Sequence, residues 1–143
     1  ISYIDRNNKK VRPIMLHRAV FGSIERFIGI LIEHYAGAFP LWFAPEQISV
    51  LPVNNEAHLK YAAKLNKKLI NLGLRSSLNG ANEKLGYRLR QSQIAKIPYT
   101  IVIGDREMNE NLVTYRKFGK EDQITVPYKD FIAMIRREIK NKA

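Results

Sequence analysis

The chain has 143 residues and no cysteine, so one compact domain with a short appendage is expected, and disulfide scaffolds, cysteine nucleophiles and cysteine-based zinc sites are excluded. Its 45% hydrophobic and 26% charged residues argue against disorder, and no apolar run approaches the roughly 18 residues of a membrane span. The net charge is +11, of which residues 48–143 carry +9. This excess suits a polyanionic partner, although net charge alone is equally compatible with a basic surface that has no partner.

The first part of the chain is expected to contain β structure followed by one apolar helix. Strand-like segments occupy residues 1–4 and 13–17, on either side of a polar turn at residues 7–10. Ser23 is a candidate N-cap, and apolar side chains then recur at helical spacing as far as Tyr35. Because Ile30 and Ile32 make this helix apolar nearly all round, we expect it to be buried.

Glycine and proline residues separate this part from the rest. Gly37, Pro40 and Pro45 interrupt the pattern at the point where the charge balance also changes. We therefore expect two units, residues 1–45 and residues 46–143. The chain starts without Met or a signal-peptide pattern, which is typical of the interior of a longer protein.

After Pro45, short apolar segments alternate with amphipathic ones. The expected strands are residues 48–53, 74–78, 99–103, 112–116 and 124–126, and the expected helices are residues 56–72, 83–94 and 128–140. Gly104 and Asp105 are expected to turn the chain between two strands. The pattern predicts an α/β fold, with a mixed sheet of about five strands and about three flanking helices, preceded by a separate strand–helix piece.

Two polar residues of the first unit could carry chemistry. Arg26 follows the candidate N-cap and could hold a triphosphate, because guanidinium offers fixed donors to phosphate oxygens. By spacing alone, a structural ion pair involving Glu25 is the better explanation. His17 could ligate zinc, but zinc needs three or four ligands, and His34 and His58 lack the appropriate spacing. A complete zinc site within the chain is therefore not expected.

The second unit contains a polar cluster that suits single-stranded RNA. Its members lie in residues 82–90, at Lys96, in residues 104–107 and in residues 115–117, with Lys84 and Arg88 expected on one helix face. Asn provides a donor and an acceptor, Glu accepts from a guanine edge, and Arg donates to a base or phosphate. A solvated charged face is the commoner origin of such clusters. No serine triad, Walker loop or dinucleotide fingerprint is present.

Two stretches carry a family resemblance. Residues 15–33 and 39–45 resemble motif 3 and the exit of the class II aminoacyl-tRNA synthetases. Residues 82–90, 97–99 and 104–107 resemble the C-terminal anticodon-binding domain of the same enzymes, and both stretches are most similar to the bacterial threonyl-tRNA synthetases. The resemblance covers essentially the whole chain and implies the anticodon-binding fold for residues 46–143.

The resemblance also implies a reaction and its residues. The parent enzyme would activate threonine with ATP and Mg²⁺ and transfer it to tRNA(Thr). Arg26 corresponds to the catalytic arginine that holds ATP, Ser23 to a residue of the same pocket, and His17 to one of three protein ligands of a Zn²⁺ ion. The positions associated with the anticodon are Asn82, Lys84, Arg90, Lys96, Glu107 and Arg116, of which Glu107 and Arg116 would read the central guanine.

The sequence also departs from the family pattern. Ala81 stands where relatives often have Arg, and Lys96 where some have Arg. Motifs 1 and 2, the other two zinc ligands and the editing domain are missing from the sequence. We therefore expect a C-terminal fragment that binds the tRNA(Thr) anticodon stem-loop, holds no cofactor and cannot aminoacylate. The parent would be a cytoplasmic homodimer, and the fragment could be monomeric.

Two alternatives stay open at this point. The chain could be a non-catalytic RNA-binding module, or it could belong to a synthetase of sister specificity, such as prolyl or histidyl. His17, nine residues before Arg26, favours the threonyl enzymes, because the sister enzymes have no use for that ligand. Both residues argue against a pure binding module.

Overall fold

The computed structural model describes residues 1–142 and divides the chain into two units, residues 1–31 and the part from residue 32 onward. In the first unit, β1 (Tyr3–Ile4) and β2 (Lys10–Val11) form a short antiparallel hairpin. The Asp5 carboxylate closes its turn by accepting from the backbone N–H groups of Asn7 and Lys9. An irregular segment leads from the hairpin to helix α1 (Ile24–His34).

The predictions of a strand at residues 13–17 and of a buried helix are wrong for the described part of the chain. Residues 13–17 form no regular element, because a strand needs a neighbour to complete its backbone hydrogen bonds. No residue of α1 is buried, and Ile24, Ile28, Ile30 and Ile32 are 48–63% exposed. An apolar helix face is buried only when another element supplies a matching surface.

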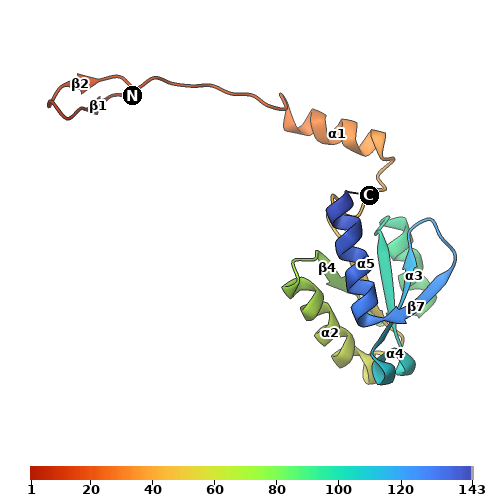
Figure 1. Cartoon of the computed structure of the whole chain (residues 1–143). Helices are drawn as coiled ribbons and strands as arrows, with labels where there is room; N and C mark the ends of the chain where they lie inside the picture. Colours follow the sequence, from red (N-terminus) through yellow and green to blue (C-terminus); the bar gives the residue numbers. More distant parts are fainter. Residues whose placement is uncertain (143) are drawn as a thin grey trace. The chain divides into compact units, whose positions relative to one another are not determined.

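The second unit is built on a five-stranded mixed sheet, as predicted. Its strands are β3 (Ile48–Pro52), β4 (Ser76–Leu78), β5 (Tyr99–Ile103), β6 (Leu112–Lys117) and β7 (Gln123–Pro127), in the order β4-β3-β5-β6-β7. The strand β3 is parallel to β4 and β5, whereas β5, β6 and β7 are antiparallel neighbours. Figure 1 labels the two outer strands, β4 and β7, on either side of α5 in that view. The first half of the sheet is therefore of the βαβ type and the second half is a meander.

The helices of this unit are α2 (Asn55–Asn71), α3 (Leu85–Ile94), α4 (Asp105–Glu110) and α5 (Tyr128–Asn141). The six-residue helix α4 replaces the simple turn expected at Gly104 and Asp105, because the Glu107 carboxylate accepts from the Gly104 N–H and caps the helix. The helix α3 begins at Leu85, two residues later than expected, so Lys84 precedes the helix. The expectation that Lys84 and Arg88 share one helix face is therefore wrong, since Arg88 is buried and Lys84 is exposed.

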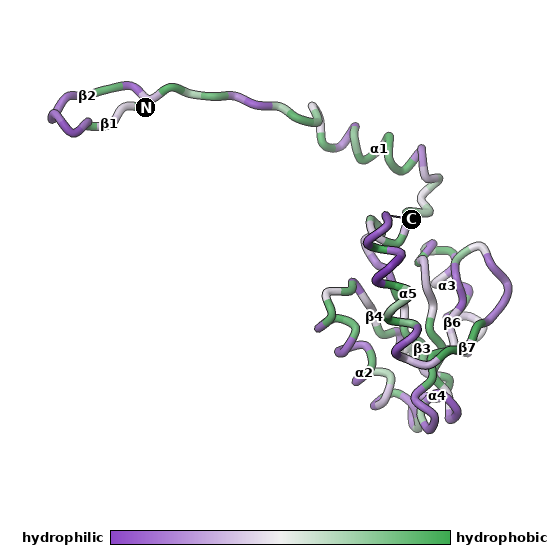
Figure 2. The backbone as a smooth tube through the Cα atoms, in the orientation of Figure 1, coloured by the Kyte–Doolittle hydropathy of each residue, from purple (hydrophilic) through white to green (hydrophobic). Residues whose placement is uncertain are grey.

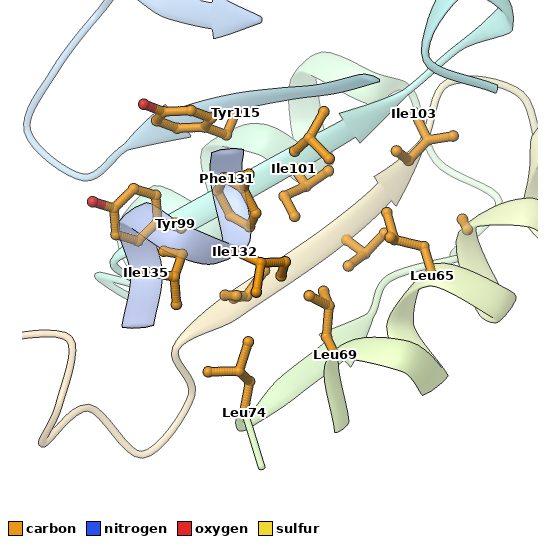
Figure 3. Packing of buried hydrophobic residues seen from close by; sticks show 14 of the residues in the cluster. Leu65, Leu69, Leu74, Tyr99, Ile101, Ile103, Tyr115, Phe131, Ile132 and Ile135 are labelled. Carbon is orange, nitrogen blue, oxygen red and sulfur yellow. The ribbon is translucent and has the colours of Figure 1, made fainter. Parts of the chain in front are cut away.

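The hydrophobic core lies between one face of the sheet and two helices. Figure 3 shows Leu65 and Leu69 of α2 and Phe131 and Ile135 of α5 directed toward the apolar side chains of the strands. The rings of Tyr99, Tyr115 and Phe131 pack with centroids 5.2–6.1 Å apart. Figure 2 shows that apolar residues extend along most of α1, whereas α5 is mainly hydrophilic outside its buried stripe.

The opposite face of the sheet carries alternate, more polar residues. In β6, Thr114 and Arg116 alternate with the buried Val113 and Tyr115, so they point away from the core. The helix α3 packs against β3 on this side, and side chains of α3, β5 and β6 line a small pocket. The β7 residues opposite Thr114 and Arg116 are exposed, so this half of the face is open to solvent.

The segment between α1 and β3 belongs to the second unit and packs within it. Leu41 is 1% exposed and belongs to the core, and its carbonyl accepts from the Gln47 side chain at 2.8 Å. The Arg75 guanidinium donates to the carbonyls of Ala44 and Trp42. By packing, the chain therefore divides after Leu31. A functional boundary between residues 45 and 46 stays a prediction.

Candidate nucleic-acid interface

Glu107 and Arg116 come from different elements and lie on the same open face of the sheet. Arg116 and Thr114 lie two residues apart on one side of β6. The Thr114 hydroxyl donates to Glu107 Oε1 at 2.6 Å, which places the α4 carboxylate beside this row. The structure thus places on one face of the sheet the two residues that the resemblance assigned to one base. Thr114, which holds the Glu107 carboxylate, was missed because a threonine in a strand carries no distinctive sequence signal.

The Glu107 carboxylate is fixed in its charged form. Its burial opposes ionisation, but hydrogen bonds from Thr114 and from the Gly104 N–H outweigh that cost, and the pKa of Glu107 lies below its ordinary value of 4.5. An ionised carboxylate only accepts hydrogen bonds, and each oxygen keeps a further lone pair. Glu107 can therefore accept from a pair of N–H groups such as those on the Watson–Crick edge of guanine.

Arg116 is half-buried and held from two sides. Its Nε donates to the Lys120 carbonyl at 2.8 Å, in the β6–β7 turn. In the amide orientation that satisfies its hydrogen bonds, the Gln93 side chain turns its oxygen toward Arg116. This oxygen accepts from Arg116 Nη1 at 3.1 Å and so connects α3 to β6. The guanidinium lines a groove together with Gln93, Phe118, Gly119, Lys120 and Glu121. No acidic side chain forms an ion pair with Arg116 in residues 1–142, so its charge is available to an anionic ligand.

Asn82, Lys84 and Arg90 belong to another part of the surface, around the start of α3. Asn82 is exposed in the loop between β4 and α3 and lines a polar cleft with Asn54, Asn55, Glu56, Glu83 and Arg88. Lys84 immediately precedes α3, and Arg90 is exposed on it. Within the described residues, neither basic side chain is paired with a carboxylate. These three residues present donors that a polyanion can use.

Lys96 is directed elsewhere. It follows the C-terminus of α3 with a left-handed φ of 54°, and its ammonium donates to the Ala36 carbonyl in the turn after α1. Its side chain also lies against Gly37. The structure thus places the Lys96 side chain against the turn that follows α1 rather than beside Glu107 or Arg116. An anticodon contact by Lys96 stays a prediction.

The candidate residues of the first unit are all exposed. Ser23 caps α1: its hydroxyl accepts from the Arg26 N–H at 3.4 Å and donates to the Glu25 carboxylate at 2.9 Å. Backbone hydrogen bonding and this hydroxyl lower the pKa of Glu25. Glu25 forms no ion pair with a cation in the described residues, which differs from the structural pair favoured by spacing. His17 lies in the irregular segment before the helix.

A metal site is not assembled in residues 1–142, where no cluster of three or more His, Asp or Glu residues has suitable geometry. His58 is buried for a structural reason. Its Nδ1 accepts from the Asn54 N–H at 3.1 Å, so Nε2 carries the proton and donates to Asp105 at 3.1 Å. This histidine therefore connects the start of α2 to the start of α4.

Comparison with known proteins identifies the class of this domain. Residues 47–138 match the family described as the anticodon binding domain, and the chain belongs to that family. In residues 1–142, no helix combines the length and apolar character that crossing a membrane requires.

The relatives to which the chain is similar are threonine–tRNA ligases. The chain is 48% identical to threonine–tRNA ligase 2 from Bacillus subtilis and 50% identical to threonine–tRNA ligase from Desulforamulus reducens, in each case over 142 residues, or 99% of the chain. It spans 22% of the length of each relative. The crystal structure of the RNA binding domain of threonyl-tRNA synthetase from Cryptosporidium parvum superposes with a TM-score of 0.76 at 28% identity, covering 85% of this chain and 30% of that one. The predicted fold class and family resemblance are confirmed.

Proposed function

We propose that residues 46–143 recognise the anticodon stem-loop of tRNA(Thr) as part of a threonine–tRNA ligase. The observation that carries this proposal is that the Glu107 carboxylate, held by Thr114, and Arg116 lie on the same open face of the sheet. The relatives of the chain support the threonine specificity.

The chemistry of the pair suits a guanine. Glu107 would accept from two N–H groups on the Watson–Crick edge of the guanine, and Arg116 would donate to the base or to the adjoining phosphate. Asn82, Lys84 and Arg90 would contact the neighbouring nucleotides from the start of α3. The +9 charge of residues 48–143 supports binding by releasing counterions from the RNA.

The first unit would serve the ligase reaction of a longer enzyme. Arg26 and Ser23 would line the pocket for ATP and Mg²⁺, and residues 1–45 would be the end of the catalytic domain. His17 would be one ligand of a Zn²⁺ ion, but a single exposed histidine cannot hold zinc by itself. The ligase would act in the cytoplasm as a homodimer. Residues 1–143 alone should give no ATP–pyrophosphate exchange, and measurable exchange would refute this part.

A binding titration tests the RNA proposal. The 143-residue chain should bind a stem-loop with a threonine anticodon more tightly than loops with other anticodons, and the affinity should fall steeply with salt. Replacing the central guanine by inosine removes the 2-amino donor and should weaken binding by roughly 1–3 kcal/mol. Equal affinity for all anticodons would refute the specificity and favour a general RNA-binding module.

A further inference from the structure

The loop formed by residues 79–84 connects β4 to α3 and carries Asn82 at its centre and Lys84 at its end. The loop is exposed over residues 81–84, yet two side chains from outside it hold its backbone. These side chains are those of Arg88 in α3 and Asn55 in α2.

Arg88 connects three chain segments through carbonyl oxygens. Its side chain is buried in a residue that is 3% exposed. Its Nη1 donates to the Asn79 carbonyl at 2.9 Å, its Nε to the Glu83 carbonyl at 3.1 Å, and its Nη2 to the Pro52 carbonyl at 2.7 Å. The guanidinium therefore joins both ends of the 79–84 loop to the end of β3.

No carboxylate pairs with this buried cation in the described residues. Burial lowers the pKa of the Arg88 guanidinium, although an arginine stays protonated at neutral pH. Burying a charge that only carbonyl dipoles neutralise is costly, and an apolar residue would fill the same space with less penalty. An arginine at residue 88 is thus explained better by the shape that it imposes on the 79–84 loop than by a contribution to the stability of the fold.

Asn55 holds the middle of the same loop. Its Nδ2 donates to the Gly80 carbonyl at 2.9 Å and reaches the Ala81 carbonyl at 3.3 Å. A Cβ on Gly80 would lie 2.8 Å from Leu59 Cδ1, so the backbone passes directly against α2. Arg88 and Asn55 together take four carbonyls of a six-residue loop, while the Asn82 side chain is left exposed.

We propose that Arg88 is a positioning residue for RNA recognition: its guanidinium fixes the 79–84 loop in the form that presents Asn82 and Lys84 to the anticodon loop. This inference rests on the proposed function for the identity of the ligand. It assigns to the one buried basic side chain of α3 a role distinct from that of the exposed contacts, because Arg88 acts through the backbone of its neighbours.

A double-mutant cycle on the 143-residue chain tests the assignment. Arg88→Lys keeps the charge but cannot reach three carbonyls, and it should weaken binding of the threonine stem-loop roughly tenfold, as expected for one or two lost net hydrogen bonds. Combined with Asn82→Ala, the loss should be clearly less than the sum of the single losses, because both act through one loop. Combined with Arg116→Ala, which lies in a different element, the losses should add.

Two further measurements separate positioning from general destabilisation. Ser92→Ala removes another buried polar group of α3. It should lower stability about as much as Arg88→Lys does, but it should leave the affinity for the stem-loop unchanged. Asn55→Ala should weaken binding in the same direction as Arg88→Lys, and amide hydrogen exchange should accelerate in residues 79–84 in both variants. If Arg88→Lys unfolds the chain, Asn55→Ala carries the test through the same cycle.

The outcomes are distinguishable. Full additivity of Arg88→Lys with Asn82→Ala, or an unchanged affinity in Arg88→Lys, overturns the positioning role while leaving the proposed function intact. Failure of the unaltered chain to bind any stem-loop overturns the proposed function, and the positioning role for RNA is overturned with it.

Discussion

The helices α1 and α5 illustrate what an apolar stripe can and cannot predict. Both carry apolar residues at helical spacing, yet α5 buries Phe131, Ile132 and Ile135 against the sheet, while α1 buries no residue. Periodicity identifies the side of a helix that can be covered. It does not reveal whether the covering surface belongs to the same stretch of chain. Most of the excess positive charge also lies in the second unit, which is the unit with a hydrophobic core.

The largest expected effect is on stability. Phe131→Ala should reduce the free energy of unfolding by about 3–5 kcal/mol, because it opens a cavity between Tyr99, Tyr115 and the helix. Ile30→Ala in α1 should change it by less than about 0.5 kcal/mol, since that side chain is exposed. Urea denaturation of both variants measures the difference. A similar loss in both would show that α1 is packed in solution.

The next effect concerns RNA binding. Arg116→Ala should weaken binding of the threonine stem-loop by roughly 1–3 kcal/mol if the guanidinium reads a base. Arg137→Ala, on the helix that covers the opposite face of the sheet, and Arg26→Ala in the first unit are matched controls for lost charge. Isothermal titration should show a much smaller change in both controls. Equal losses in all three variants would mean that Arg116 contributes only surface charge.

A smaller effect should appear in the pH dependence of stability. The pKa of Glu107 is lowered in the folded chain, so its stabilising contribution is fully present above the ordinary pKa of 4.5 and is lost as the pH falls through the lowered value. Glu107→Gln should therefore cost about 1 kcal/mol at neutral pH and progressively less below pH 4. Thermal unfolding of the unaltered chain and of Glu107→Gln from pH 3 to 7 measures this difference in stability. A difference independent of pH would contradict the ionised capping role.

The smallest effect is expected at Lys96. Lys96→Ala removes the bond to the Ala36 carbonyl and should lower stability by no more than about 1 kcal/mol. Its effect on stem-loop affinity should stay below that of Arg116→Ala, because its ammonium is engaged with the segment after α1. Lys84→Ala, an exposed lysine at the other end of α3, is the comparison variant. A larger loss of affinity for Lys96→Ala would place the anticodon nearer to that segment.

The strands β3 and β5 were predictable because each is a short apolar run with Gly, Pro or Asn close to its ends. Helix α4 was not, because six residues are too few to show a helical period, and its cap depends on the Glu107 side chain. The candidate site was predicted in part. Glu107 and Arg116 followed from the resemblance, whereas Thr114 and Gln93 take their roles from packing across elements. The burial of Arg88 was invisible, since its three carbonyl partners are distributed over residues 52 to 83.

The two outer strands of the sheet have a consequence for self-association. The strand β4 has only three residues, and Pro127 at the end of β7 lacks an N–H group. Both edges are therefore poor templates for strand addition by a second molecule. If this chain forms oligomers or precipitates at high concentration, the exposed isoleucines of α1 should make the contacts between molecules. Polar substitutions of these isoleucines should then keep the chain monomeric without altering the proposed RNA-binding surface.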